Sequence, residues 1–77
     1  MSFENRQEDI EKLLSMKIGD AIYLNMFQGG GSCVFRETVD NWMLFEIPLY
    51  GGNDQYYGDF SKDKLDDLVR TVYDVFT

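Results

Sequence analysis

Apolar and polar residues alternate along the middle of the chain and follow helical spacing near both ends. From Ala21 to Phe27, every second residue is Ile22, Leu24 or Met26, which is the pattern of a half-buried strand. Towards the C-terminus the apolar residues recur at helical intervals, so that one face of a helix would carry five of them: Leu65, Leu68, Val69, Val72 and Phe76. Ser61 precedes this run and is predicted to cap the helix, with Asp63 in its first turn.

A first helix is predicted from Asn5 to Met16. Asn5 is a suitable N-cap, and Glu8, three residues later, completes a capping-box pattern. The apolar stripe of this helix would consist of Ile10, Leu13 and Leu14.

Three more strands are predicted, at Cys33 to Val39, Trp42 to Ile47 and Gln55 to Phe60. Between them, we expect a glycine-rich loop at Gln28 to Ser32, a two-residue turn at Asp40-Asn41 and a turn at Leu49 to Asp54. Short turns make neighbouring strands antiparallel. The predicted fold class is therefore α+β, in the order α-β-β-β-β-α: a four-stranded antiparallel meander with two helices packed on one face, a two-layer sandwich, in a single domain over residues 1–77.

The turn at Asp40-Asn41 determines which side chains share a face of the predicted sheet, because strand register follows from turn geometry. One face would lie under the helices, with Arg36 and Thr38 as its polar members, and would carry Ile22, Leu24, Met26, Val34, Met43, Phe45 and Ile47. The other would meet solvent and would carry Tyr23, Asn25, Phe27, Cys33, Phe35, Glu37, Val39, Trp42, Leu44 and Glu46.

Aromatic residues make up 16 % of the chain, more than one small core easily encloses. An exposed apolar face commonly marks an interaction site, and Trp and Tyr are enriched in binding hot spots. The segment from Pro48 to Phe60 adds several tyrosines among glycines, as binding loops do. The candidate partner-binding residues are Tyr23, Phe35, Glu37, Trp42, Leu44, Glu46, Tyr50, Tyr56 and Tyr57. Alternatively, these aromatic residues stabilise a thin sheet through cross-strand pairs, or the face forms a homodimer.

Fourteen acidic against seven basic residues give a net charge of −7. This charge argues against binding to nucleic acid or an anionic membrane, since phosphate neutralisation needs clustered Lys and Arg. It is compatible with a basic protein partner, with imitation of nucleic acid, or with a role in solubility alone.

Catalytic chemistry is poorly supported. The chain contains no histidine, which removes the commonest general base and zinc ligand, and Cys33 is the only cysteine. The glycine loop lacks the lysine and following helix of a phosphate-binding loop, and the acids Asp59, Asp63, Asp66 and Asp67 lack calcium-loop spacing. We therefore expect no enzyme, cofactor or metal.

With one cysteine, no basic-then-apolar leader and no apolar run approaching about 20 residues, the chain is predicted to be soluble and cytoplasmic. The function expected from the sequence is a non-enzymatic protein-binding module, namely a small acidic adaptor, inhibitor or immunity-type protein. Two alternatives stay open: a structural homodimer that uses the same face, and an acidic mimic of nucleic acid that inhibits a DNA-binding enzyme.

Overall fold

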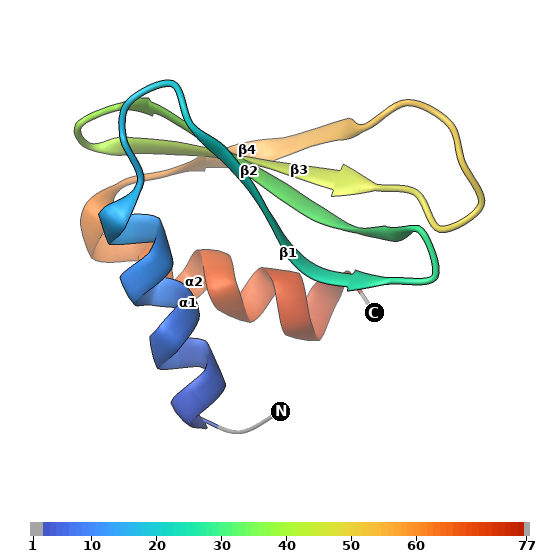
Figure 1. Cartoon of the computed structure of the whole chain (residues 1–77), viewed down its shortest axis with the longest axis horizontal. Helices are drawn as coiled ribbons and strands as arrows, with labels where there is room; N and C mark the ends of the chain where they lie inside the picture. Colours follow the sequence, from blue (N-terminus) through green and yellow to red (C-terminus); the bar gives the residue numbers. More distant parts are fainter. Residues whose placement is uncertain (1–2, 77) are drawn as a thin grey trace.

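The structure of the chain is a computed structural model that describes the backbone from Phe3 to Phe76 and the side chains from Arg6 to Phe76. Its elements follow the predicted α-β-β-β-β-α order (Figure 1): α1 (Phe3–Ser15), β1 (Ala21–Phe27), β2 (Gly30–Thr38), β3 (Asn41–Ile47), β4 (Gln55–Phe60), η1 (Lys62–Lys64), α2 (Leu65–Arg70) and η2 (Thr71–Val75). The four strands form one antiparallel sheet in the order β1-β2-β3-β4, so the predicted α+β class is confirmed.

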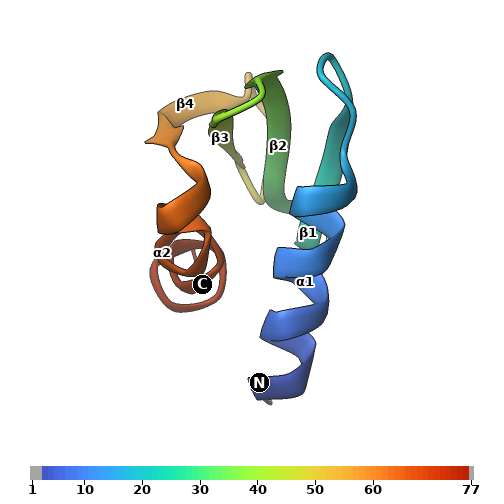
Figure 2. The ribbon, with the colours of Figure 1, turned by 90° about the vertical axis from the view of Figure 1, so that its left-hand side faces the viewer.

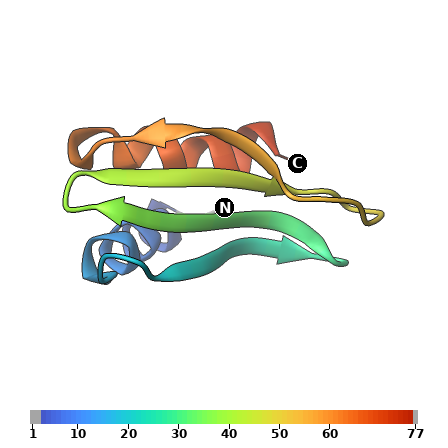
Figure 3. The same cartoon turned by 90° about the horizontal axis from the view of Figure 1, so that it is seen from above.

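Both helices lie on the same side of the sheet. Figure 2 shows that α2 runs beneath the sheet, whereas α1 meets it with its C-terminal end and then descends away from it. Viewed from the opposite side, in Figure 3, no segment of the described chain crosses in front of the strands. The structure therefore has two layers, with one face of the sheet left open.

The core lies between the sheet and the helical layer. It consists of Leu13, Met16, Leu24, Val34, Trp42, Leu44, Leu65, Leu68, Val69 and Val72, none of which is more than 5 % exposed. Four of the five residues predicted for the last helix belong to this set, and the fifth, Phe76, packs against it. In α1, Leu14 is 41 % exposed instead of buried, and Asp9 takes its place on the inner face, where its carboxylate accepts a hydrogen bond from the Tyr73 hydroxyl.

Two side chains from the sheet hold the last turn of α1. The Trp42 indole N–H donates to the Leu13 carbonyl at 2.9 Å, and the Arg36 guanidinium donates to the carbonyls of Met16 and Val39. The guanidinium also lies over the Trp42 ring, 4.4 Å from its centroid. Carbonyl groups at the C-terminal end of a helix lack hydrogen-bond donors within the helix. Arg36 and Trp42 supply these donors and bury the end of α1 against the sheet.

The predicted turn at Asp40-Asn41 is wrong by one position, and a bulge that the sequence pattern does not predict reverses β3. Val39 and Asp40 form the turn, Thr38 pairs with Asn41, and a bulge at Glu37 then brings Arg36 opposite Trp42. Neither turn residue has the positive φ of a mirror-image hairpin turn, and the bulge restores the twist that such a turn would supply. As a result, the Trp42 side of β3 faces the helices and the Met43 side faces away.

Smaller differences concern the ends of elements. The glycine loop is only a tight turn at Gln28 and Gly29, and Ser32 lies inside β2, fully buried, with its hydroxyl donating to the Leu24 carbonyl at 2.8 Å. Asn5 lies within α1 rather than before it, and its side chain is outside the described residues.

Ser61 occupies the predicted N-cap position, but its hydroxyl donates to Asp63 and accepts no hydrogen bond from the N–H groups of the helix. Asp40, from the β2–β3 turn, instead accepts from the Lys62 N–H at 2.8 Å. Over the part of the chain that the structure describes, no helix has the length and apolar character needed to cross a bilayer.

Candidate functional site: the open face of the sheet

The helix-free face of the sheet carries two rows of side chains that run across all four strands. Strand pairing aligns Tyr23, Cys33, Phe45 and Tyr56 in the first row and Ala21, Phe35, Met43 and Asp59 in the second. These residues alternate with the buried residues of the core, and we call the eight of them the open face (Figure 3).

Side chains of the open face are partly exposed although most of them are apolar. Tyr23 is 66 % and Tyr56 55 % exposed, while Phe35, Met43 and Phe45 are half-buried by their neighbours in the sheet. The Phe45 and Tyr56 rings meet edge to face, with centroids 5.7 Å apart. Cross-strand aromatic contacts of this kind stabilise a sheet and also present a rigid apolar surface to solvent.

The charge of this face is negative. Asp59 accepts a hydrogen bond from the Tyr56 hydroxyl at 2.7 Å, which is the main reason that the pKa of this phenol is raised. Glu37 lies near enough to raise the same pKa, and Asp54 contributes to the raised pKa of Cys33. The four strands contain a single cation, Arg36, and its guanidinium is held on the other side of the sheet.

Cys33 lies in the middle of the first row as a half-buried thiol. Burial, and secondarily the charge of Asp54, raise its pKa above the ordinary value. A thiol with a raised pKa stays protonated at neutral pH and is a poor nucleophile. Its contribution here is a small apolar side chain between Tyr23 and Phe45.

Of the residues predicted for the site, Tyr23, Phe35 and Tyr56 lie together on the open face, and Glu37 stands at the end of β2, where it accepts from the Asn41 amide at 3.0 Å. Trp42 and Leu44 do not belong to any surface, because both are completely buried. The reversed orientation of β3 explains this error.

Three further predicted residues lie elsewhere. Glu46 is on the helix side of the sheet, since it alternates with Phe45. Tyr57 occupies a bulge in β4 and packs edge to face with Phe76, 5.2 Å between centroids, also on the helix side. Tyr50 is 96 % exposed in the β3–β4 loop, outside the strands that form the open face.

Met43 and Phe45 are the open-face residues that sequence reasoning placed in the core. Their strand is apolar on both sides, so alternation alone does not decide its orientation. Trp42 was the residue that could have indicated the orientation of β3. A large side chain with an N–H group suits a buried position beside an unpaired carbonyl.

The acids Asp59, Asp63, Asp66 and Asp67 are distributed over β4, η1 and α2. Among the described residues, no group of three or more potential metal ligands comes together. Asp67 pairs with Arg70 at 3.2 Å, and the Ser61 hydroxyl lowers the pKa of Asp63 by hydrogen bonding.

Compared with known proteins, the chain matches no family model, no curated protein and no solved structure at a significant level.

Proposed function

We propose that this chain is a non-enzymatic protein-binding module that docks a partner protein through the open face. The observation that carries the proposal is the pair of cross-strand rows, in which aromatic and aliphatic side chains stay partly exposed on a sheet face without covering helices. Contiguous apolar surface of this kind is typical of interaction sites, and Tyr and Phe are favoured there.

The negative charge around this face indicates the chemistry of the partner. Glu37, Asp54 and Asp59 border the apolar rows, and the net charge of the chain is −7. A partner that offers an apolar centre bordered by Lys and Arg would complement this arrangement. Nucleic acid would place phosphates against these carboxylates, which opposes binding.

A second copy of the chain is the less favoured occupant. A two-fold interface places the same patch against itself, so the carboxylates of the two copies would lie close to one another. Like charges at an interface are unfavourable, especially at low salt. The structural homodimer is thus the alternative that a sedimentation experiment decides.

Binding is favoured over catalysis by the chemistry available. The sequence has no histidine, and the Cys33 thiol has a raised pKa. The open face offers contact area and a hydrogen-bonded Tyr56–Asp59 pair, and these suit recognition.

The test compares Tyr23→Ser, which removes an exposed ring from the open face, with Tyr50→Ser, which removes one from the β3–β4 loop. Both rings are exposed, so circular dichroism should report a native fold for each variant. Wild type and Tyr50→Ser should capture the same protein from the source cell, and Tyr23→Ser should lose it. With the purified partner, binding should weaken as salt is added.

Equal capture by all three proteins would contradict the proposal. A wild-type dimer in sedimentation that Tyr23→Ser dissociates would establish the homodimer instead. If the partner binds DNA and DNA competes for it, the chain is the acidic mimic of nucleic acid considered from its sequence.

A further inference from the structure

The sheet extends beyond the end of the last helix, and a hollow lies beneath the overhanging part. In Figure 1 the β1–β2 turn and the β3–β4 loop reach past the C-terminal end of the helical layer. The hollow has a volume of about 520 Å³, and we call it the end hollow; it is lined by Asn25, Met26, Phe27, Gly30, Gly31, Glu46, Ile47, Leu49 and Phe76. It lies on the helix side of the sheet, away from the open face.

Apolar side chains provide most of the lining. Met26, Phe27 and Leu49 are 45 %, 67 % and 41 % exposed, and they come together here with Phe76. Side chains of this size do not usually gather at a solvent-filled hollow unless something covers them. A volume of this order suits a small organic group.

The charge at the end hollow is negative. Among the residues that the structure describes, Glu46 is the only ionisable one in the lining, and no Lys or Arg belongs to it. The last helical segment, η2, ends beside it, because Phe76 follows η2 directly and lines the wall. The C-terminal end of a helix carries partial negative charge on its free carbonyls. The carboxylate and the helix end therefore favour a cation at the same place.

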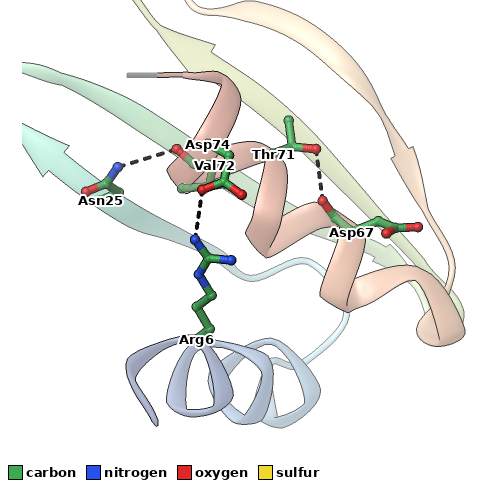
Figure 4. A network of polar contacts seen from close by, with 6 residues as sticks. All are labelled: Arg6, Asn25, Asp67, Thr71, Val72 and Asp74. Carbon is green, nitrogen blue, oxygen red and sulfur yellow. Dashed lines mark hydrogen bonds and ion pairs between the residues drawn. The ribbon is translucent and has the colours of Figure 1, made fainter. Parts of the chain in front are cut away.

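Backbone and side chains approach one another closely in the walls of the hollow. A Cβ added to Gly31, whose φ is +146°, would lie 2.7 Å from Met26 Sδ, and one added to Gly30 would lie 2.8 Å from the Leu49 Cα. Asn25 ties the β1–β2 hairpin to the helix end, since its Nδ2 donates to the Val72 carbonyl at 3.4 Å (Figure 4). A preformed wall lowers the ordering cost of binding.

We infer that the end hollow binds an organic cation in which a primary amine is attached to a compact aromatic or branched aliphatic group. The apolar part would lie against Phe27, Leu49 and Phe76, and the ammonium group would lie between Glu46 and the end of η2. This site is separate from the open face and does not depend on the function proposed for it.

The test is a titration of the whole ¹⁵N-labelled chain with phenethylamine, followed by amide chemical shifts. Saturable shifts are expected at Met26, Phe27, Ile47 and Leu49 and not on the open face. 2-Phenylethanol has the same apolar group without charge and should bind roughly fivefold more weakly or worse, and 3-phenylpropionate should not bind.

Two variants check the residues, with one matched control. Glu46→Gln should weaken phenethylamine binding by roughly two- to fivefold, as expected for one partly exposed ion pair. Phe27→Ser should weaken it as well, and its exposed ring is not needed for folding. Glu11→Gln removes the same charge from α1 and should leave the affinity unchanged. Equal binding of the three compounds, shifts elsewhere, or equal effects of Glu46→Gln and Glu11→Gln would overturn the inference.

A parallel titration with the peptide amide Phe-Gly-Gly distinguishes two sources of the cation. Binding at least as tight as that of phenethylamine would identify the N-terminus of a peptide as the ligand. Binding of phenethylamine alone would identify a free amine. Failure of both amines would refute the site and leave the open-face proposal untouched.

Discussion

Replacing Trp42 with Phe tests the orientation of β3 directly. The change keeps an aromatic ring at the position but removes the indole N–H that donates to the Leu13 carbonyl at 2.9 Å. It also reduces the surface on which the Arg36 guanidinium lies. The Leu13 carbonyl keeps only the 3.3 Å contact from the Met16 N–H.

Three losses add up to the expected cost. The hydrogen bond contributes about 0.5–1.5 kcal/mol. The gap left by the smaller ring costs about 1 kcal/mol, because Trp42 is fully buried. The weaker cation–π contact adds about 0.5 kcal/mol. The free energy of unfolding should therefore fall by about 2–3 kcal/mol, which corresponds to a decrease in Tm of roughly 8–24 °C in a domain of this size.

Urea and thermal unfolding followed by circular dichroism measure the effect, since the variant lacks the chain's only Trp. Tyr23→Leu, on the open face, serves as the control and should change stability by no more than about 0.5 kcal/mol. If Trp42→Phe melts with the wild type while Tyr23→Leu melts early, the two faces of the sheet have been assigned the wrong way round.

Other expectations concern the core, the phenols and the β1–β2 hairpin. Leu68→Ala should cost about 2–5 kcal/mol, because Leu68 is fully buried in α2; an unchanged urea midpoint would place α2 outside the core. Burial, and then the hydrogen bond to Asp9, raise the pKa of Tyr73 to about 12. The folded state thus holds this proton more tightly than the unfolded state, and its contribution to stability, complete below about pH 10, is lost as pH rises towards 12. In a pH titration, the phenolate absorbance should show a step at high pH that is missing in Tyr73→Phe. Gly31→Ala should lower Tm, because its methyl group would meet the Asn25 carbonyl oxygen at 2.8 Å at a φ of +146°; a Tm equal to wild type would contradict the tight hairpin.

The positions of all four strands and of the last helix follow from the hydrophobic pattern, because each has a clear period or clear turn residues beside it. The inward side of β1 and β2 is also predictable: Leu24 and Val34 are buried as alternation requires. Alternation failed in β3 and at Asn25 of β1, which was predicted for the solvent face but donates to the Val72 carbonyl on the helix side, at a bulge in β1. The sequence of β3, Asn41 to Ile47, is apolar on both sides, so its orientation depends on the bulge at Glu37, just before the preceding turn.

The location of that turn depends on contacts far away in the sequence. Asp40 accepts from the Lys62 N–H, and Arg36 must reach the carbonyl of Met16. Neither requirement is visible in the local pattern around Val39. The same error affected the candidate site. Tyr23, Phe35 and Tyr56 were predicted correctly for the open face. From β3, however, Trp42 and Leu44 were predicted, whereas Met43 and Phe45 lie there.

The attachment of α1 to the sheet has a consequence for the order in which the chain acquires structure during synthesis. A helix of 13 residues is marginally stable on its own. The donors that complete its last turn, Arg36 and Trp42, are 20 and 29 residues further along the chain than their acceptors Met16 and Leu13. They are translated later and reach these carbonyls only once β2 and β3 have paired. The first helix to leave the ribosome should therefore be among the last parts of the chain to become protected from hydrogen exchange.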